Sequence, residues 1–149
     1  MKKMIKEKIT KANQGDSFTM MGLKITVKQN AESSNGLISV LEQEVAPGAG
    51  SPPHICSKED KIIYVVEGNF EVLLGDEAHG CTAGDTITIP RGTRHNFKNS
   101  GLQQGKILVT LTPGGHENFL RDLSHSLVQP GADKGVMKLI AEKHGVILG

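Results

Sequence analysis

Residues 84–99 read GDTITIPRGTRHNFKN, and this stretch decides the fold. The side chains from Thr86 to Ile89 alternate strictly between polar and apolar, which is typical of a strand with one buried face. Pro90 and Gly92 then favour a turn, because proline fixes φ and glycine tolerates conformations that other residues avoid. The stretch therefore predicts two strands joined by a tight turn, with His95 at the start of the second strand.

Short apolar runs of the same kind extend in both directions. They lie between Phe18 and Leu111, and each is bounded by glycine, proline, asparagine or aspartate. Gly68-Asn69 separates two such runs and indicates a hairpin. About eight to ten short strands at this spacing are typical of an all-β sandwich or closed barrel. No helical pattern separates the strands, which argues against a parallel α/β sheet.

The last part of the chain has a different periodicity. Between residues 116 and 127 apolar side chains recur at helical spacing, namely Phe119, Leu120, Leu123 and Leu127. A second helix is predicted over 132–144, followed by Gly145 in the place of a helix C-terminal glycine. We therefore predict a basic N-terminal arm over residues 1–14, a β-barrel over 15–113 and a helical tail over 114–149 that packs on the barrel.

Composition excludes several classes of partner. The chain of 149 residues has 17 Lys and Arg against 16 Asp and Glu, so it lacks the basic excess that nucleic acids or anionic membranes attract. Two cysteines do not form a disulfide framework, and no apolar run is long enough to span a bilayer. The first ten residues lack the apolar segment of a signal peptide. We expect a cytoplasmic protein with reduced thiols that binds neither nucleic acid nor membrane.

A second stretch, GSPPHICSKEDKIIYVVEG at residues 50–68, carries the reactive side chains. Side chains two residues apart on a strand share a face, so His54 and Cys56 point to the same side. Lys61, Ile63 and Val65 likewise share one face of the following strand. The opposite face of that strand is apolar as well, so alternation alone leaves open which face lies inside.

Both stretches resemble the two sequence motifs of the cupin superfamily. The second motif is matched at its fixed positions by Gly84, Pro90, Gly92, His95 and Asn99. The first motif is matched by Gly50, His54 and Gly68. From about Gly15 to Gly149 the chain is similar to small single-domain cupins that are compared with quercetin dioxygenases. This resemblance implies an all-β jelly-roll barrel with two short C-terminal α-helices, and a homodimer in which the strand at residues 18–20 joins the partner's sheet.

The first motif departs from the pattern of metal-binding cupins, which supply two histidines and a glutamate there and a third histidine from the second motif. By this resemblance His54 and His95 are two of the ligands, whereas Cys56 and Lys61 replace the second histidine and the glutamate. An ammonium group repels a divalent cation unless it swings away or loses its proton. Glu59 is in phase with Lys61, so it either supplies the missing carboxylate or pairs with the lysine.

Three alternatives follow for this altered site. In the favoured one the pocket is metal-free, and Lys61 takes the electrostatic place of the metal and binds an anionic or aromatic small molecule. In the second, His54, Cys56 and His95 bind a divalent ion, with Zn, Fe, Mn and Ni as candidates. In the third, the site is vestigial and the protein has only a packing or regulatory role.

These alternatives correspond to different functions. A metal-bound site would resemble that of a dioxygenase-like oxidoreductase. A metal-free site would support isomerase or proton-transfer chemistry, with His95 as base and Lys61 as electrostatic stabiliser. A non-catalytic sensing or binding module is the remaining class. The predicted pocket consists of His54, Cys56, Glu59, Lys61, Ile63, His95 and Phe97. The other histidines, including His116, are expected at the surface or on helices without a role.

Overall fold

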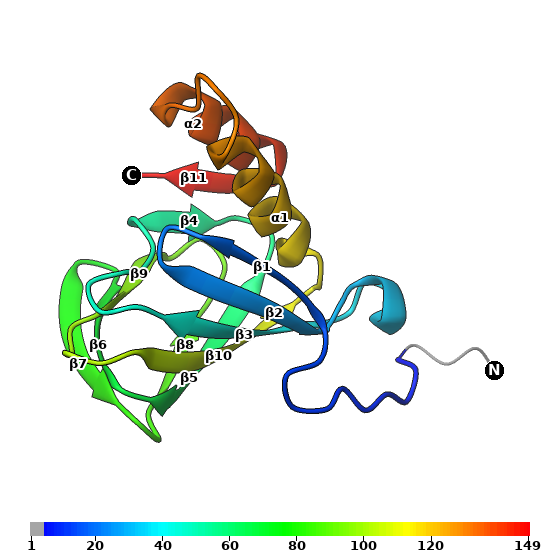
Figure 1. The fold of residues 1–149 in the computed structure, drawn as a ribbon, viewed down its shortest axis with the longest axis horizontal. Coiled ribbons are helices and arrows are strands. Elements are labelled where there is room, and N and C mark those ends of the chain that lie inside the picture. The colour runs from blue at the N-terminus through cyan, green and yellow to red at the C-terminus, as the bar shows by residue number, and fades with distance from the viewer. Residues whose placement is uncertain (1–4) are drawn as a thin grey trace.

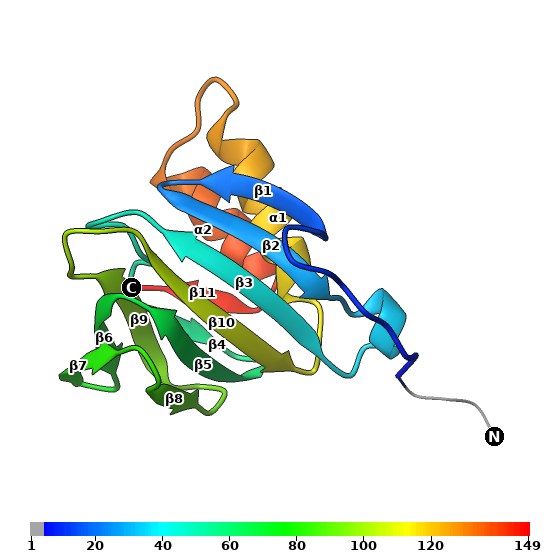
Figure 2. The same cartoon turned by 60° about the horizontal axis from the view of Figure 1, so that its bottom comes forward.

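A computed structural model describes residues 5–149 and consists of two antiparallel β-sheets with two helices at one end (Figures 1 and 2). One sheet has the strand order β1-β2-β3-β10-β5-β8, and the other has the order β11-β4-β9-β6-β7. The strands are β1 (Asp16–Met20), β2 (Leu23–Gln29), β3 (Ser39–Val45), β4 (His54–Cys56), β5 (Asp60–Glu67), β6 (Asn69–Leu74), β7 (Glu77–Thr82), β8 (Thr86–Ile89), β9 (Arg94–Asn99), β10 (Gly105–Thr112) and β11 (Val146–Leu148). The helices are η1 (Glu32–Ser34), α1 (His116–Leu127) and α2 (Lys134–Lys143).

The predicted all-β jelly-roll with two C-terminal helices is confirmed. The strands form two separate hydrogen-bonded sheets instead of one sheet closed on itself. Helix α2 begins two residues later than the predicted start at 132. The prediction also missed β11, whose three residues pair with β4. So short a segment shows no periodicity of its own, and it becomes a strand because β4 offers a free edge.

Strand β5 shows which face lies inside. Lys61, Ile63 and Val65 are at most 5% exposed, whereas Ile62 and Tyr64 are more than 40% exposed. The inner row joins a core made of side chains from both sheets and from α1. The face that carries Lys61 is therefore the buried face, and the outer apolar residues lie on the molecular surface.

Gly50 explains how β4 comes to lie beside β9. A Cβ atom at this position would lie 2.0 Å from the carbonyl oxygen of Phe97, so only glycine allows the two backbones to approach. The neighbouring Ser51 donates its backbone N–H to the same oxygen at 2.9 Å. This contact brings the chain into position for the pairing of His54 with His95 across β4 and β9.

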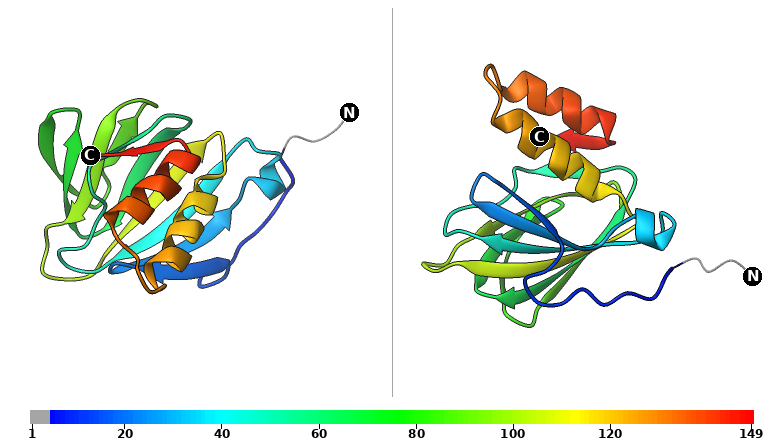
Figure 3. Two further views of the ribbon diagram at one scale, coloured as in Figure 1. Left: turned by 90° about the horizontal axis from the view of Figure 1, so that it is seen from above. Right: turned by 45° about the vertical axis from the view of Figure 1, so that its right-hand side comes forward.

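The helical tail lies over one end of the two sheets (Figure 3). Phe119, Leu120 and Leu123 of α1 are buried in the core. At the start of α1, the Glu117 carboxylate accepts hydrogen bonds from Ser39 Oγ at 2.6 Å and from the backbone N–H of Ala31 at 2.9 Å. These contacts attach the start of α1 to strand β3 of the larger sheet and to the loop after β2.

The N-terminal arm contains no helix or strand between residues 5 and 15. Thr10 Oγ1 donates to the carbonyl oxygen of Lys28 on β2 at 3.0 Å, which holds the arm against that strand. Residues 1–4 of the predicted arm lie outside the described residues. Strand β1 pairs with β2 of its own chain. The structure describes a single chain, and the homodimer stays a prediction. Within residues 5–149 no helix has the length and apolar character needed to cross a membrane, and the cytoplasmic location stays a prediction.

Candidate functional site

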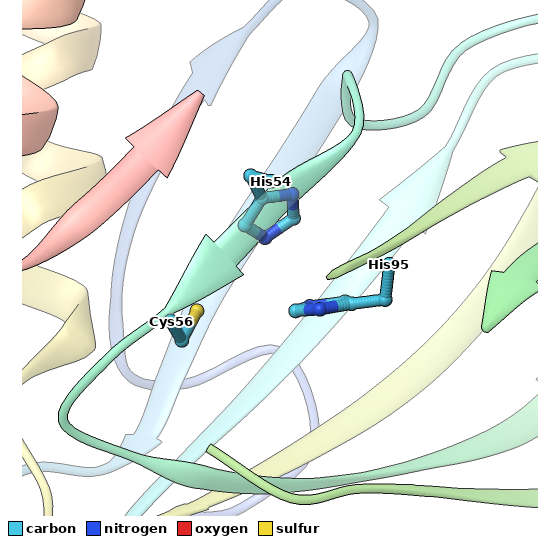
Figure 4. Close-up of side chains that lie close together, drawn as sticks. All are labelled: His54, Cys56 and His95. Atoms are coloured by element: carbon cyan, nitrogen blue, oxygen red, sulfur yellow. The ribbon is translucent and has the colours of Figure 1, made fainter. Parts of the chain in front are cut away.

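Three of the predicted reactive side chains, His54, Cys56 and His95, lie close together (Figure 4). His54 and Cys56 project from β4, Lys61 from β5 and His95 from β9. The two imidazole rings lie with their centroids 4.3 Å apart, and His54, Cys56 and His95 have ligating atoms within 4.8 Å of one another. Because β4 and β9 pair in register at the two histidines, residues 41 positions apart in the sequence face one another.

The hydrogen bonds of the two histidines set their protonation pattern. His54 Nδ1 lies 2.8 Å from the carbonyl oxygen of Pro52, and His95 Nδ1 lies 2.9 Å from that of Thr93. A carbonyl oxygen only accepts, so each Nδ1 carries the proton and each Nε2 keeps a lone pair when the ring is neutral. The same arrangement is common in metal-ligating histidines, in which the Nε2 lone pairs point at the ion.

Lys61 occupies the place where both lone pairs point. Its Nζ lies 2.8 Å from His95 Nε2 and 3.5 Å from His54 Nε2. A protonated amine has three donors, and two of them meet imidazole nitrogens here. The ammonium group of Lys61 thus takes the position that a metal ion would need between these side chains.

Burial penalises every charge in this cluster. It lowers the pKa of Lys61 below its ordinary value of 10.5, although Cys56 and Glu59 counteract this effect. Burial and the nearby Lys61 charge lower the pKa of His95 to about 4 and hold that of His54 well below 6.5. Burial also raises the pKa of the Cys56 thiol. At neutral pH both histidines are therefore uncharged, and Lys61 is their hydrogen-bond donor.

A narrow cavity of about 60 Å³ lies between the jelly-roll and the helical tail. It has room for a few water molecules or for a small group of a ligand. Its wall is mostly apolar, with side chains from the sheets, α1, α2 and β11, and polar groups at a few points. Four of the predicted pocket residues line it, namely His54, Lys61, Ile63 and Phe97.

Cys56, Glu59 and His95, which were also predicted for the pocket, do not line this cavity. His95 is 1% exposed and lies against Lys61, whose side chain separates it from the cavity. Glu59 does not stand in for the missing metal ligand among His54, Cys56 and His95. It belongs to a second cluster with Cys56 and His116, and its Oε2 atom is buried without a hydrogen-bond partner within residues 5–149.

Sequence reasoning missed His116 and Gln43, which both line the cavity. His116 is predicted at the surface or on a helix; it is the first residue of α1, but it is only 6% exposed. The signal for it was present, because His116 lies three and four residues before Phe119 and Leu120 and so extends their buried stripe backwards. Gln43 is buried on β3. It is in phase with apolar Leu41 and Val45, and this spacing is the signal for an inward position.

By donor type, the set of His54, Cys56 and His95 is compatible with a divalent metal ion. As the side chains lie, however, Lys61 fills the space between the two Nε2 atoms. A cation bound there would lie next to the ammonium group and be repelled by it. The present arrangement therefore does not fit a metal ion at this position unless Lys61 moves out.

Comparison with known proteins agrees with this fold. The family described as "Cupin domain" matches residues 41–111, which include β4, β5 and β9. This part of the chain is a cupin domain. Its fold is similar to the structure of KdgF from a Halomonas species, with 20% identity, a TM-score of 0.68, and coverage of 76% of this chain and 99% of that one.

Curated cupin relatives share about a third of their matched residues with this chain. Protein SchB of Streptomyces halstedii is 33% identical over 69 residues, which is 46% of this chain and 50% of SchB. Oxalate oxidase 1 of Hordeum vulgare is 32% identical over 118 residues, which is 72% of this chain and 58% of the oxidase. The chain thus spans about half the length of these relatives. A specific likeness to quercetin dioxygenases stays a prediction.

Proposed function

We propose that this cupin binds a small anionic molecule, with the Lys61 ammonium group in place of a metal ion. The observation that carries this proposal is the position of Lys61 Nζ, 2.8 Å from His95 Nε2 in a site whose cavity it lines. A cation in an apolar pocket stabilises a carboxylate, an enolate or a phenolate far more than it does in water. Oxalate, the anion in the name of one relative, belongs to this class.

The contacts of Lys61 leave it able to bind an additional group. Its bond to His95 is short, whereas the 3.5 Å contact with His54 is at the limit of a hydrogen bond. A protonated amine also has a third donor beyond the two that meet the imidazole nitrogens. A carboxylate oxygen that enters the cavity can therefore accept from this third donor or replace the weaker contact with His54, while His95 keeps the lysine in place.

Binding of matched anionic and neutral probes tests this function. Oxalate and benzoate are titrated into metal-free protein by calorimetry at pH 7, each beside its neutral amide, oxamide or benzamide. We expect at least one of the two anions to bind one per chain and at least about tenfold more tightly than its amide, because only the anion forms a charge-assisted bond with Lys61. Equal affinity for acid and amide, or no binding of either anion, would contradict the proposal.

Proton transfer is the catalytic extension of this proposal. The hydrogen bond between Lys61 Nζ and His95 Nε2 is the path along which a proton would move between the two side chains. With an enolate-forming ligand in the cavity, Lys61 would stabilise the developing oxyanion. His95, which does not line the cavity, would act as the base by receiving the substrate proton through the Lys61 amine. This chemistry is isomerase-like and needs no metal at the Lys61 position.

A metal-dependent, dioxygenase-like activity is the second candidate, and the donor set of His54, Cys56 and His95 favours it. Under this alternative only Lys61 prevents the ion from binding. Lys61→Glu is expected to raise the affinity for Zn²⁺ or Mn²⁺ at this position, because a carboxylate replaces the repelling ammonium group. Calorimetry with the metal salts measures the gain, and Lys98→Glu on the exposed side of β9 is the matched control.

The gain should disappear when His95→Ala is added to Lys61→Glu. If Lys61→Glu binds these ions no more tightly than the control, position 61 does not face the metal position and this candidate fails.

A further inference from the structure

A second cluster lies beside the first cluster, which is formed by His54, Cys56 and His95. The second cluster consists of Cys56, Glu59 and His116. Each offers one ligating atom, and the three atoms lie within 4.8 Å of one another. Their side chains come from three places, namely the end of β4, the loop before β5 and the first residue of α1. All three are buried, with exposed fractions of 2% for Cys56 and 6% for both Glu59 and His116.

Two atoms of this cluster lack a partner that they should have. Glu59 Oε2 and His116 Nδ1 are buried, and neither has a hydrogen bond to any residue between 5 and 149. Buried side-chain polar atoms are nearly always hydrogen bonded, and an unpaired one costs about 1–3 kcal/mol. A buried carboxylate and a buried imidazole nitrogen, both unpaired and both beside a thiol, indicate a missing group that binds all three.

We propose that Cys56, Glu59 and His116 bind a divalent metal ion such as Zn²⁺, at a position shifted from the usual cupin centre toward helix α1. Thiolate, carboxylate and imidazole are the three donor types of zinc sites, and tetrahedral zinc with three protein ligands keeps a fourth position open. Ligating atoms within 4.8 Å need to close by about 1 Å to reach zinc–ligand distances. The site goes beyond the proposed anion binding and does not depend on it.

The charges of the ligands explain why a divalent ion would bind at the second cluster in preference to the first cluster. A thiolate and a carboxylate together neutralise a divalent cation, whereas His54, Cys56 and His95 supply a single negative charge. The first position also contains the Lys61 amine, 2.8 Å from His95 Nε2. Burial raises the pKa values of Cys56 and Glu59, and the Lys61 charge opposes this effect.

A hollow gives access to the second cluster from the surface. It has a volume of about 180 Å³ and is lined by Glu59 and His116 together with Lys58, Lys143 and His144. The two lysines at this hollow slow the approach of a cation, so metal loading should be measured after long incubation. The position of the hollow means that an ion reaches the cluster without passing through the cavity beside Lys61.

Cobalt and zinc binding test the site, because Co²⁺ bound by a thiolate in tetrahedral geometry gives a charge-transfer absorption that an oxygen-bound ion lacks. Apo protein with Cys81→Ser, which leaves Cys56 as the sole thiol, is titrated with Co²⁺ and then with Zn²⁺. We expect one ion per chain with thiolate absorption. His116→Ala and Glu59→Gln should each weaken binding at least about 10-fold, as expected for loss of one ligand.

Two control variants place the ion. His95→Ala should keep the affinity within about threefold, since His95 belongs to the first cluster alone. His125→Ala, an exposed histidine on the same helix α1, should have no effect. Circular dichroism of each variant checks that it is folded, and Glu59→Gln preserves size if His116→Ala destabilises the protein.

Three outcomes would overturn the proposal: no thiolate absorption with Co²⁺, binding that His116→Ala and Glu59→Gln leave unchanged, or binding that is lost in His95→Ala. The last outcome would instead place the ion at the usual cupin centre.

Discussion

Lys61→Met should weaken the binding of oxalate or benzoate about 10- to 100-fold, because it removes a charge-assisted hydrogen bond worth about 1.5–3 kcal/mol. Methionine has a similar length and fills the same space without a charge or a donor. The cavity keeps its apolar wall, so the binding of benzamide, which does not need the charge, should change much less. Calorimetry at pH 7 with wild type and variant measures both differences.

The control for this variant is Lys98→Met, which removes a lysine from the exposed side of β9. It changes the net charge by the same amount, so it corrects for long-range attraction of the anion. Equal losses of affinity in Lys61→Met and Lys98→Met would mean that the anion senses only the overall charge. The Lys61 cavity would then not be the binding site.

Acid should destabilise the protein between pH 6.5 and about 4. The pKa of His95 falls from 6.5 to about 4 in the folded chain, so the unfolded chain binds a proton in this range that the folded chain does not. Stability that is present above pH 6.5 is therefore lost as the pH falls toward 4. A shift of this size corresponds to about 3 kcal/mol in the free energy of unfolding.

Other buried groups modify this slope. His54 and His116 have pKa values held well below 6.5 by burial, and they add to the loss of stability. Burial raises the pKa of Glu59, so the folded chain binds this proton more readily than the unfolded chain does. Glu59 therefore adds stability to the folded protein in acid and offsets part of the loss. The net effect should still be a marked decrease, since three histidines oppose one carboxyl group.

Urea unfolding at a series of pH values measures this dependence. His95→Gln, which retains an acceptor for Lys61, should flatten the slope between pH 6.5 and 4, whereas exposed His125→Gln should not. A wild-type stability that stays constant over this range would show that His95 is protonated as readily in the folded chain as in the unfolded one. This result would contradict the hydrogen bonds that Lys61 forms with His54 and His95.

The motif residues were sufficient to predict the fold and the main pairing of the site. Glycine at position 50 and the turn at Pro90 and Gly92 limit the backbone so strongly that His54 and His95 must meet across β4 and β9. Alternation could not tell which face of β5 lies inside, because Ile62 and Tyr64 are as apolar as a core face requires. The location of Lys61 in the interior follows only from the packing of the two sheets.

Contacts with the helical tail were harder to predict. His116 and β11 reach the site only after the chain has folded back over the end of the sheets, and no local pattern specifies that path. The sequence left open whether Glu59 supplies a metal ligand or pairs with Lys61, and its cluster with Cys56 and His116 depends on where α1 begins. The path of the helical tail and the cluster of Glu59 both depend on long-range packing. The spacing of residues in a single sequence does not show such packing.

A crystal structure of zinc-soaked protein, with anomalous data at the zinc edge, tests the central claim most directly. We predict electron density for Lys61 Nζ between the Nε2 atoms of His54 and His95, with no anomalous peak there. An anomalous peak bound by His54, Cys56 and His95, with Lys61 turned away, would contradict the account.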